Sequence, residues 1–138
     1  MIIYKIMNTD DVFNNFDEYC IPEKIVRLNR FKNCFLDFLK YIDSGKKDYK
    51  STDYFNYMNG RHKRKSRKIL EEVKIYKSIK KDGLINPIDM YVINNKAKIV
   101  RGYRRLMGLH HLKRKDLPCR IFDSIEDYRR LKPSVRWK

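Results

Sequence analysis

The stretch from residue 73 to 122 constrains the fold most, because its turn signals separate helical from strand-like segments in a fixed order. A helical pattern stops at Gly83, and glycine is a natural helix end because it tolerates positive φ. Two strand-like runs follow, at 88–93 and 97–101. The Asn94-Asn95 pair between them suits a two-residue turn, since asparagine tolerates left-handed geometry, so the two strands are predicted to form a hairpin.

The remainder of this stretch predicts a glycine loop, a helix and a further strand. The second strand ends at Gly102, and a helix is expected over 103–112. Leu117-Pro118 then leads into a last strand at 119–122, while the helix before the hairpin is expected over 64–82. The fold class is therefore α+β, with a small mixed sheet flanked by helices.

The loop at Gly102 has the chemistry of an anion site. A strand that ends at a glycine and opens a helix leaves unbonded backbone N–H groups at the helix N-terminus, where the helix dipole favours negative charge. Arg101, Arg104 and Arg105 add guanidinium groups that can fork onto phosphate oxygens. The alternative is a solvated basic helix start in which the glycine serves turn geometry alone.

Three segments resemble those of the ParB/sulfiredoxin superfamily, the amino-terminal domain of ParB-type partition proteins. Residues 78–88, SIKKDGLINPI, are similar to the family's SI-x-x-x-G-x-x-x-PI segment, and residues 102–106, GYRRL, to its G-x-R-R-L box. Residues 117–121, LPCRI, resemble its closing strand. The resemblance spans residues 69–122 and implies a stand-alone ParB/sulfiredoxin-like domain whose glycine-arginine loop binds the phosphates of a nucleotide.

The resemblance also implies which ligand is held and by which residues. We expect a nucleoside triphosphate, CTP or ATP, bound together with Mg²⁺. The expected cofactor-binding residues are Asn86, Pro87, Ile88, Arg101, Gly102, Tyr103, Arg104 and Arg105. In this interpretation Arg104 or Arg105 forks onto a phosphate, and Asn86 contacts the base or the sugar.

Departures from the family's pattern bear on catalysis. Sulfiredoxin-like enzymes carry a cysteine where this chain has Tyr103, and a phenol cannot do the chemistry of a thiol. The free-serine kinases of this fold have an acidic residue and a histidine where Arg101 and Tyr103 stand. No helix-turn-helix region follows, so operator reading of the partition type is not expected. A non-enzymatic binding module is favoured, with a ParB-like nuclease, NTPase or phosphotransferase as the alternative.

Charge indicates a polyanionic partner. The chain carries 33 Lys and Arg against 17 Asp and Glu, a net charge of +16. This favours nucleic acid, DNA before RNA, and an anionic membrane surface is the competing interpretation. Two basic runs are expected to contact nucleic acid: Arg61, Lys63, Arg64, Lys65, Arg67 and Lys68, and then Lys113, Arg114 and Lys115. The first run lies where the dipole of the 64–82 helix disfavours positive charge, so an external anion would offset that cost. A solvated basic link is the alternative.

Neither a metal site nor a membrane span is expected. Cys20, Cys34 and Cys119 are widely spaced and form no zinc pattern with the histidines, which predicts three reduced thiols. No stretch of about 18 apolar residues occurs and the N-terminus does not suit a secretory signal, so a cytoplasmic protein is predicted. A single alanine amid many Lys, Asn, Ile and Tyr residues is typical of an AT-rich genome, such as that of a phage.

Residues 1–60 are predicted to form a helical N-terminal extension that packs on a ParB-like domain at 61–138. The elements expected there are a strand at 2–6, a helix capped at 8–10 and ending near 19, a helix at 22–43 and a helix capped by Ser51 that runs to 59. The apolar face of the 22–43 helix is expected in the core, and a homodimer through that face is the alternative.

Overall fold

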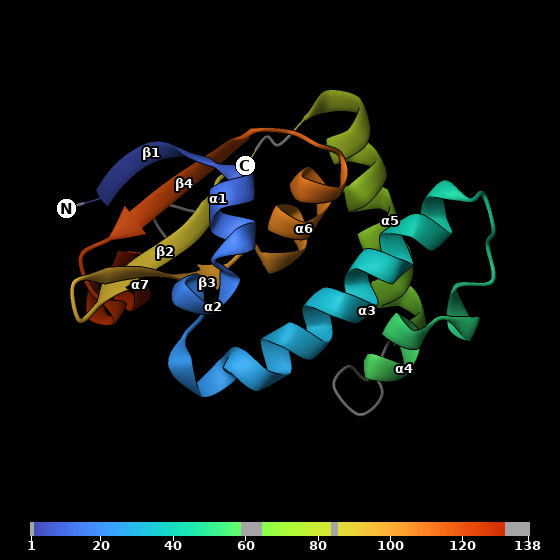
Figure 1. The fold of residues 1–138 in the computed structure, drawn as a ribbon, viewed down its shortest axis with the longest axis horizontal. Coiled ribbons are helices and arrows are strands. Elements are labelled where there is room, and N and C mark those ends of the chain that lie inside the picture. Colours follow the sequence, from blue (N-terminus) through green and yellow to red (C-terminus); the bar gives the residue numbers. More distant parts are fainter. Residues whose placement is uncertain (1, 59–64, 84–85, 132–138) are drawn as a thin grey trace.

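The computed structural model describes residues 2–58, 65–83 and 86–131, with the backbone alone for residues 65 and 66. Its strands and α-helices in chain order are β1 (Ile2–Asn8), α1 (Thr9–Asn14), α2 (Phe16–Tyr19), α3 (Ile25–Asp43), α4 (Asp53–Tyr57), α5 (Lys65–Asp82), β2 (Ile88–Ile93), β3 (Lys96–Arg101), α6 (Tyr103–His111), β4 (Asp116–Phe122) and α7 (Ile125–Leu131). Figure 1 shows α6 in the middle of the molecule, with the sheet on one side and α3 and α5 on the other.

The sheet is mixed, as the sequence predicted. Its strand order is β1-β4-β2-β3. β1 pairs antiparallel with β4, β2 pairs antiparallel with β3, and β2 runs parallel to β4. The α+β class with flanking helices is therefore confirmed. The N-terminal segment contributes an edge strand to this sheet in addition to its helices.

The predicted hairpin of β2 and β3 is confirmed, together with the reason for its turn. Asn94 has φ 51° and Asn95 has φ 65°, so both turn residues are left-handed. Two such residues make the type I′ turn whose twist matches that of paired strands. Gly83, with φ 81°, ends α5 as expected, and its N–H donates to the carbonyl of Ile79 at 2.9 Å.

The N-terminal helices differ from the sequence prediction in two places. The single helix expected to end near residue 19 is split into α1 and α2 at Asn15, whose φ is −112°. The Asn15 side chain donates to the carbonyl of Asp11 at 2.8 Å, and such a bond competes with the helical backbone pattern. Further on, Thr52 rather than Ser51 caps α4, because Thr52 Oγ1 accepts from the N–H of Phe55 at 3.3 Å.

The core joins one face of the sheet to helices α1 to α6. The apolar spacing of α3 and α5 predicted their inward faces, and the buried positions agree: Leu28, Phe31, Phe35, Phe38, Leu39 and Ile42 on α3, and Ile69, Val73, Tyr76 and Ile79 on α5. A smaller cluster beneath α7 contains Ile21, Tyr91, Phe122 and Tyr128 on the opposite face of the sheet. The core-face interpretation of the 22–43 helix is thus confirmed.

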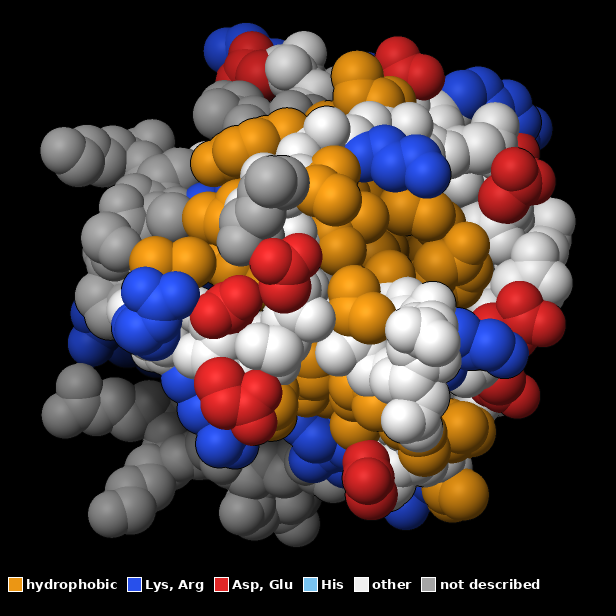
Figure 2. Space-filling model, turned by 90° about the vertical axis from the view of Figure 1, so that its left-hand side faces the viewer, with side chains coloured by type: hydrophobic (Ala, Val, Ile, Leu, Met, Phe, Trp, Pro, Cys, Tyr) orange, Lys and Arg blue, Asp and Glu red, His pale blue; other side chains and the backbone are white. Residues whose placement is uncertain are grey.

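The outer edge of the sheet is apolar and open. Ile3, Tyr4 and Ile6 of β1 are 48%, 68% and 66% exposed. Figure 2 views the molecule from the side on which β1 begins, and hydrophobic side chains gather there. Lys5 lies in the middle of this strand, and a charged residue at that position opposes pairing with another strand.

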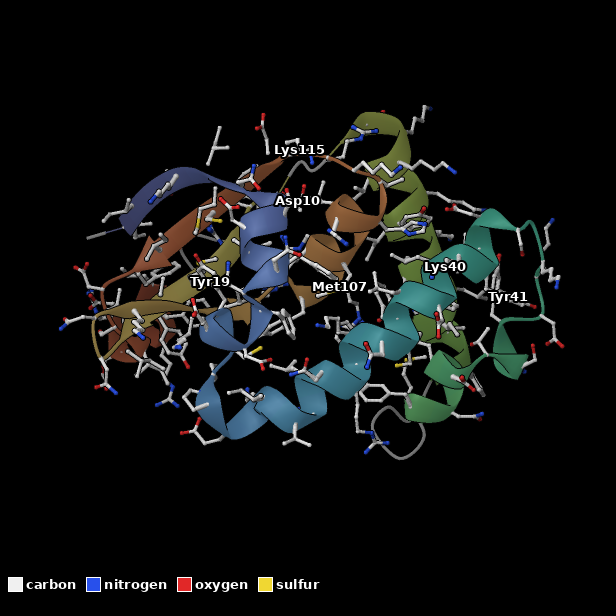
Figure 3. All side chains as sticks on the ribbon, viewed as in Figure 1. Asp10, Tyr19, Lys40, Tyr41, Met107 and Lys115 are labelled. Carbon is white, nitrogen blue, oxygen red and sulfur yellow. The ribbon has the colours of Figure 1, made fainter. Side chains whose placement is uncertain are left out.

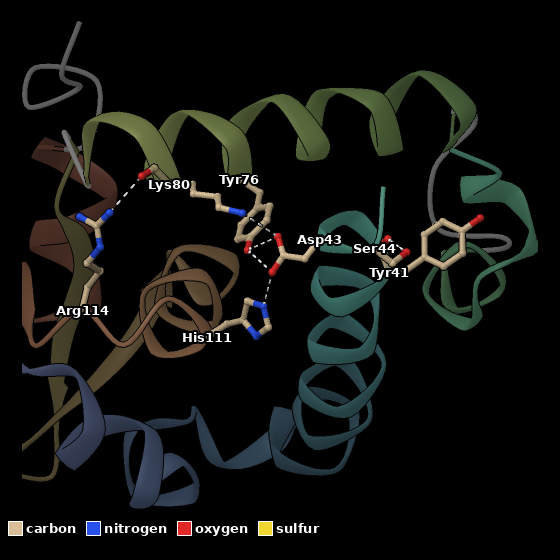
Figure 4. Close-up of polar contacts among 7 residues, drawn as sticks. All are labelled: Tyr41, Asp43, Ser44, Tyr76, Lys80, His111 and Arg114. Atoms are coloured by element: carbon tan, nitrogen blue, oxygen red, sulfur yellow. Dashed lines mark hydrogen bonds and ion pairs between the residues drawn. The ribbon is translucent and has the colours of Figure 1, made fainter. Parts of the chain in front are cut away.

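Asp43 at the end of α3 joins three helices. Its carboxylate accepts hydrogen bonds from the hydroxyl of Tyr76 at 2.9 and 3.0 Å and from Lys80 Nζ at 3.2 Å, both on α5. It also lies 2.8 Å from Nε2 of His111 at the end of α6 (Figure 4). The end of α3 is therefore bonded to both α5 and α6 through one side chain.

We expect the contribution of Asp43 to stability to depend on pH. Burial raises the pKa of Asp43, but the bonds from His111, Tyr76 and Lys80 outweigh burial and hold this pKa below the usual 3.8. A carboxylate with a lowered folded pKa stabilises the fold at higher pH and loses that contribution as pH falls through the folded pKa. Asp43→Asn should therefore cost about 1 kcal/mol at neutral pH.

Thermal melts of wild type and Asp43→Asn between neutral pH and about pH 3 measure this effect, and the gap should close below about pH 4. Asp37→Asn is the matched control, because Asp37 is exposed on the same helix. A gap that stays constant across this range would contradict a role for the carboxylate charge.

Candidate functional site

The loop between β3 and α6 packs against the start of β2. Gly102 has φ 116°, and a Cβ built there would lie 2.5 Å from Cγ2 of Ile88 and 2.7 Å from its Cβ. A side chain at position 102 would therefore be both strained and in collision. Packing alone explains this glycine, and it brings the loop beside the segment at 86–88, so the two predicted parts of the site lie together.

The start of α6 presents backbone N–H groups that lie ahead of the first hydrogen bond of the helix. The first helical bond at this end runs from the N–H of Leu106 to the carbonyl of Gly102, at 3.0 Å. The N–H groups of Tyr103, Arg104 and Arg105 precede that bond, and the side-chain-free Gly102 does not cap them. The helix dipole adds partial positive charge, so this end of α6 favours an anion.

Arg105 fixes the loop to the 86–88 segment. Its Nη1 donates to the carbonyl of Asn86 at 3.1 Å and to the carbonyl of Pro87 at 2.8 Å. Burial lowers the pKa of Arg105 to about 10, so the guanidinium remains charged at neutral pH. This half-buried cation is held in place before any ligand arrives.

Arg104 contacts two side chains inside the protein. Its Nε forms an ion pair with Oε1 of Glu72 on α5 and donates to the hydroxyl of Tyr54 on α4 at 3.0 Å. Burial disfavours its charge, but Tyr54 and Glu72 together raise the pKa of Arg104 above its usual value. The Glu72 side chain is 1% exposed. The ion pair and the hydrogen bond both involve Nε, so Arg104 acts first as the partner of a buried carboxylate.

A cavity of about 350 Å³, the loop cavity, lies between α5 and the start of α6. Its polar lining is Lys68, Glu72, Asn86, Arg101, Gly102, Arg104 and Arg105, and its apolar lining includes Phe35, Leu39, Ile75, Tyr76, Ile79 and Tyr103. Of the predicted cofactor-binding residues, Pro87 and Ile88 lie behind this lining. Four basic side chains therefore surround a space whose described lining contains one carboxylate.

Sequence reasoning missed Glu72. It lies three residues after Ile69 and four before Tyr76, on the stripe that was predicted to be buried. A charged residue on an apolar stripe is a signal for a buried ion pair. Its neighbour Glu71 is exposed and pairs with Arg67 at 3.5 Å along the same helix. The spacing could thus have distinguished the two glutamates.

Tyr103 has a packing role. Its hydroxyl donates to the carbonyl of Ile99, and its ring meets that of Phe16 edge-on at 6.0 Å. Burial raises the pKa of Tyr103, so the phenol stays protonated at neutral pH. Nothing in this arrangement prepares Tyr103 to act as a nucleophile.

Asp89 lies inside the sheet rather than at a turn. Its carboxylate accepts hydrogen bonds from Nε and Nη2 of Arg120 at 2.8 and 3.0 Å, across the parallel pair of β2 and β4. Both side chains are at most 5% exposed. The sequence predicted a strand at this position, and the buried partner of Asp89 comes from a strand far away in sequence.

The two basic runs have different surroundings. Arg61, Lys63 and Arg64 lie outside the described residues, as does the side chain of Lys65. Arg67 is exposed on α5 and Lys68 lines the loop cavity.

In the second run, Lys113 is exposed at φ 59°. Arg114 donates to the carbonyl of Lys80 at 3.0 Å, at the end of α5 (Figure 4). Lys115 pairs with Asp10 on α1, and these two side chains lie together in Figure 3. Lys113 is therefore the member of this run without such a contact to a described residue.

Two searches gave negative results within the described part of the chain. No group of three or more His, Cys, Asp or Glu residues there could hold a metal ion. No described helix is long and apolar enough to cross a membrane.

The fold and the loop together define a small α+β domain with a glycine-arginine loop at a helix N-terminus. A comparison with protein families matches residues 51–133 to the ParB N-terminal domain. The match covers more than half of the 138 residues, so the chain belongs to the ParB N-terminal domain family. Searches of curated proteins and of solved structures gave no match. The match begins at 51, whereas the division at residue 61 stays a prediction.

We expect the pair of Glu72 and Arg104 to be strongly coupled. Arg104→Met leaves a buried carboxylate without its partner and should cost about 3 kcal/mol. The double variant Glu72→Met/Arg104→Met should recover much of this loss, because no charge is then left buried. Urea unfolding of the wild type, both single variants and the double variant gives the coupling energy, expected at about 1–3 kcal/mol.

The exposed pair of Arg67 and Glu71 is the matched control, because its cycle should give about 0.5 kcal/mol or less. Additive effects of the Glu72 and Arg104 substitutions would contradict the structural role of this pair.

Proposed function

We propose that this ParB N-terminal domain binds a nucleotide through its phosphate groups in the loop cavity and associates with nucleic acid. The observation that carries the first part is the described lining of the cavity, which has four basic residues, Lys68, Arg101, Arg104 and Arg105, and one carboxylate, Glu72 of α5. Phosphate groups suit such a site because helix N–H groups and guanidinium groups both donate to their oxygens.

The basic side chains that line the loop cavity differ in what they contact. Glu72 compensates Arg104, and Lys68, Arg101 and Arg105 are the other basic side chains of the described lining. Arg105 is oriented by two carbonyls, so little of its freedom is lost on binding. A volume of about 350 Å³ is at the lower end of ligand pockets and suits a nucleotide bound by its phosphates.

The ligand in this proposal is CTP or ATP with Mg²⁺. The magnesium ion would be held mainly by the phosphates, as is usual for nucleotide sites, because Glu72 is the one described carboxylate of the lining and is already paired. The amide of Asn86 is the group suited to the base or the sugar, since it can both donate and accept.

Arg101→Gln tests the site at a residue that is exposed at the end of β3. Removing one charge-assisted contact should lower nucleotide affinity by roughly 1.5–3 kcal/mol, or about tenfold or more. Lys96→Gln is the matched control: it is exposed at the other end of the same strand and does not line the cavity. Calorimetry with CTP, ATP, ADP and GTP, with and without Mg²⁺, measures the affinities.

Absence of heat and of any thermal shift for wild type with all four nucleotides at millimolar ligand would reject the nucleotide site. Equal losses in Arg101→Gln and Lys96→Gln would show general electrostatics rather than a site.

The net charge of +16 supports the association with nucleic acid. Binding through Lys and Arg to phosphate should weaken steeply with salt, with a slope near 0.9 for each phosphate neutralised on duplex DNA. Lys63→Gln/Arg64→Gln/Lys65→Gln/Arg67→Gln should weaken binding to all sequences about equally and make the slope shallower. Mobility shifts of DNA and RNA over a salt series measure both quantities. No retardation of either at low salt would reject this part of the proposal.

A further inference from the structure

A second concave space lies on the other side of the start of α6 from the loop cavity. This aromatic hollow, of about 300 Å³, is formed by α3, α4 and the β3–α6 loop, and the described lining contains no acidic residue. Figure 1 shows α4 beside α3 at this place. The residues that give it its chemistry are Lys24, Arg27, Phe31, Tyr57, Tyr103 and Arg104. Half of them, Lys24, Arg27 and Phe31, lie outside the family match at 51–133.

The aromatic side chains of the hollow form a connected group. The ring of Tyr57 lies 6.1 Å from that of Phe31, and it is stacked on Tyr54 at 6.2 Å with an interplanar angle of 15°. The guanidinium carbon of Arg104 lies 5.5 Å from the ring centre of Phe31. Tyr57 is half-buried, so packing supports its ring while part of the ring meets solvent. A supported and partly exposed ring is what an unpaired base stacks on.

The cations at the rim are held by no described acidic partner. Lys24 and Arg27 are exposed at the start of α3, three residues apart, and neither forms an ion pair with a residue that the structure describes. The first turn of α3 contains no acidic residue. Positive charge at a helix start is electrostatically unfavourable, so an external anion would relieve it.

We propose that the aromatic hollow binds one nucleotide residue of a single-stranded nucleic acid. The base lies against Tyr57, whose ring is backed by Phe31, and the flanking phosphates bind Lys24 and Arg27. This inference rests on the nucleic-acid part of the proposed function and names its site and its substrate form. A duplex is disfavoured because its bases are already stacked and their faces are inaccessible.

The phosphate contacts are tested with two charge-matched double variants of the full chain. Lys24→Gln/Arg27→Gln removes two cations of the hollow, whereas Lys46→Gln/Lys47→Gln removes two exposed cations that lie between α3 and α4 and line neither space. Fluorescence anisotropy at low salt with a labelled oligothymidylate should show a loss of about tenfold or more for the first variant. The second should lose much less, and a duplex of the same length should discriminate less between the two variants.

The base contact is tested with Tyr57→Leu and Tyr57→Phe. The leucine variant should lose about tenfold in affinity for oligothymidylate, and the phenylalanine variant, which keeps the ring, should bind like wild type. With an abasic strand of the same length, wild type and Tyr57→Leu should bind equally, since no base is present to stack. The rim variants provide the test if Tyr57→Leu does not fold.

The outcomes separate the inference from the proposal on which it rests. If wild type binds neither single strand nor duplex at low salt, both fail. If wild type binds but the Lys24/Arg27 and Lys46/Lys47 variants lose affinity equally, the hollow is not the site, although the association with nucleic acid stands. An undiminished affinity of Tyr57→Leu for oligothymidylate would likewise overturn the base contact.

Discussion

The ion pair between Glu72 and Arg104 is the interaction on which both concave spaces depend. It joins α5 to the start of α6 and, through Tyr54, to α4. A carboxylate that is 1% exposed requires such a partner, since an unpaired buried charge is strongly destabilising. Arg104 and Tyr103 line both the loop cavity and the aromatic hollow, so this pair fixes the wall between them. Arg104, which the motif predicts to bind a phosphate, thus also stabilises the fold as the partner of Glu72.

The secondary structure of the middle of the chain could be predicted because each boundary has its own local chemistry. Gly83 ends a helix at positive φ, and the Asn94-Asn95 turn uses two left-handed residues. β4 begins at Asp116, three residues before the predicted 119. The prediction started after Pro118 because proline is uncommon in a central strand. Pro118 lies before Cys119, where the parallel ladder with β2 begins, so its missing N–H is not required there.

The parts of the site that depend on distant partners could not be predicted in the same way. The loop at Gly102 was predictable from a strand, a glycine and arginines in succession, but its contact with Ile88 requires the register of the sheet. Asp43 shows the same limit, because its three partners come from two helices that are remote in sequence. The aromatic hollow could not be predicted for a further reason. The apolar spacing of α3 predicts which face of this helix is buried, but it does not predict which residues lie next to the exposed first turn.

The pairing of β1 with β4 has a consequence for how the molecule forms. Ile2 pairs with Phe122, so the first strand of the chain finds its partner almost at the end of the described chain. Loop-closure entropy makes such contacts slow to form, and folding rates fall as the separation of contacting residues grows. On the ribosome, the apolar residues of β1 leave the exit tunnel long before β4 is synthesised. The nascent chain therefore carries an unpaired hydrophobic strand until β4 has been synthesised, and the sheet can be completed only after that point.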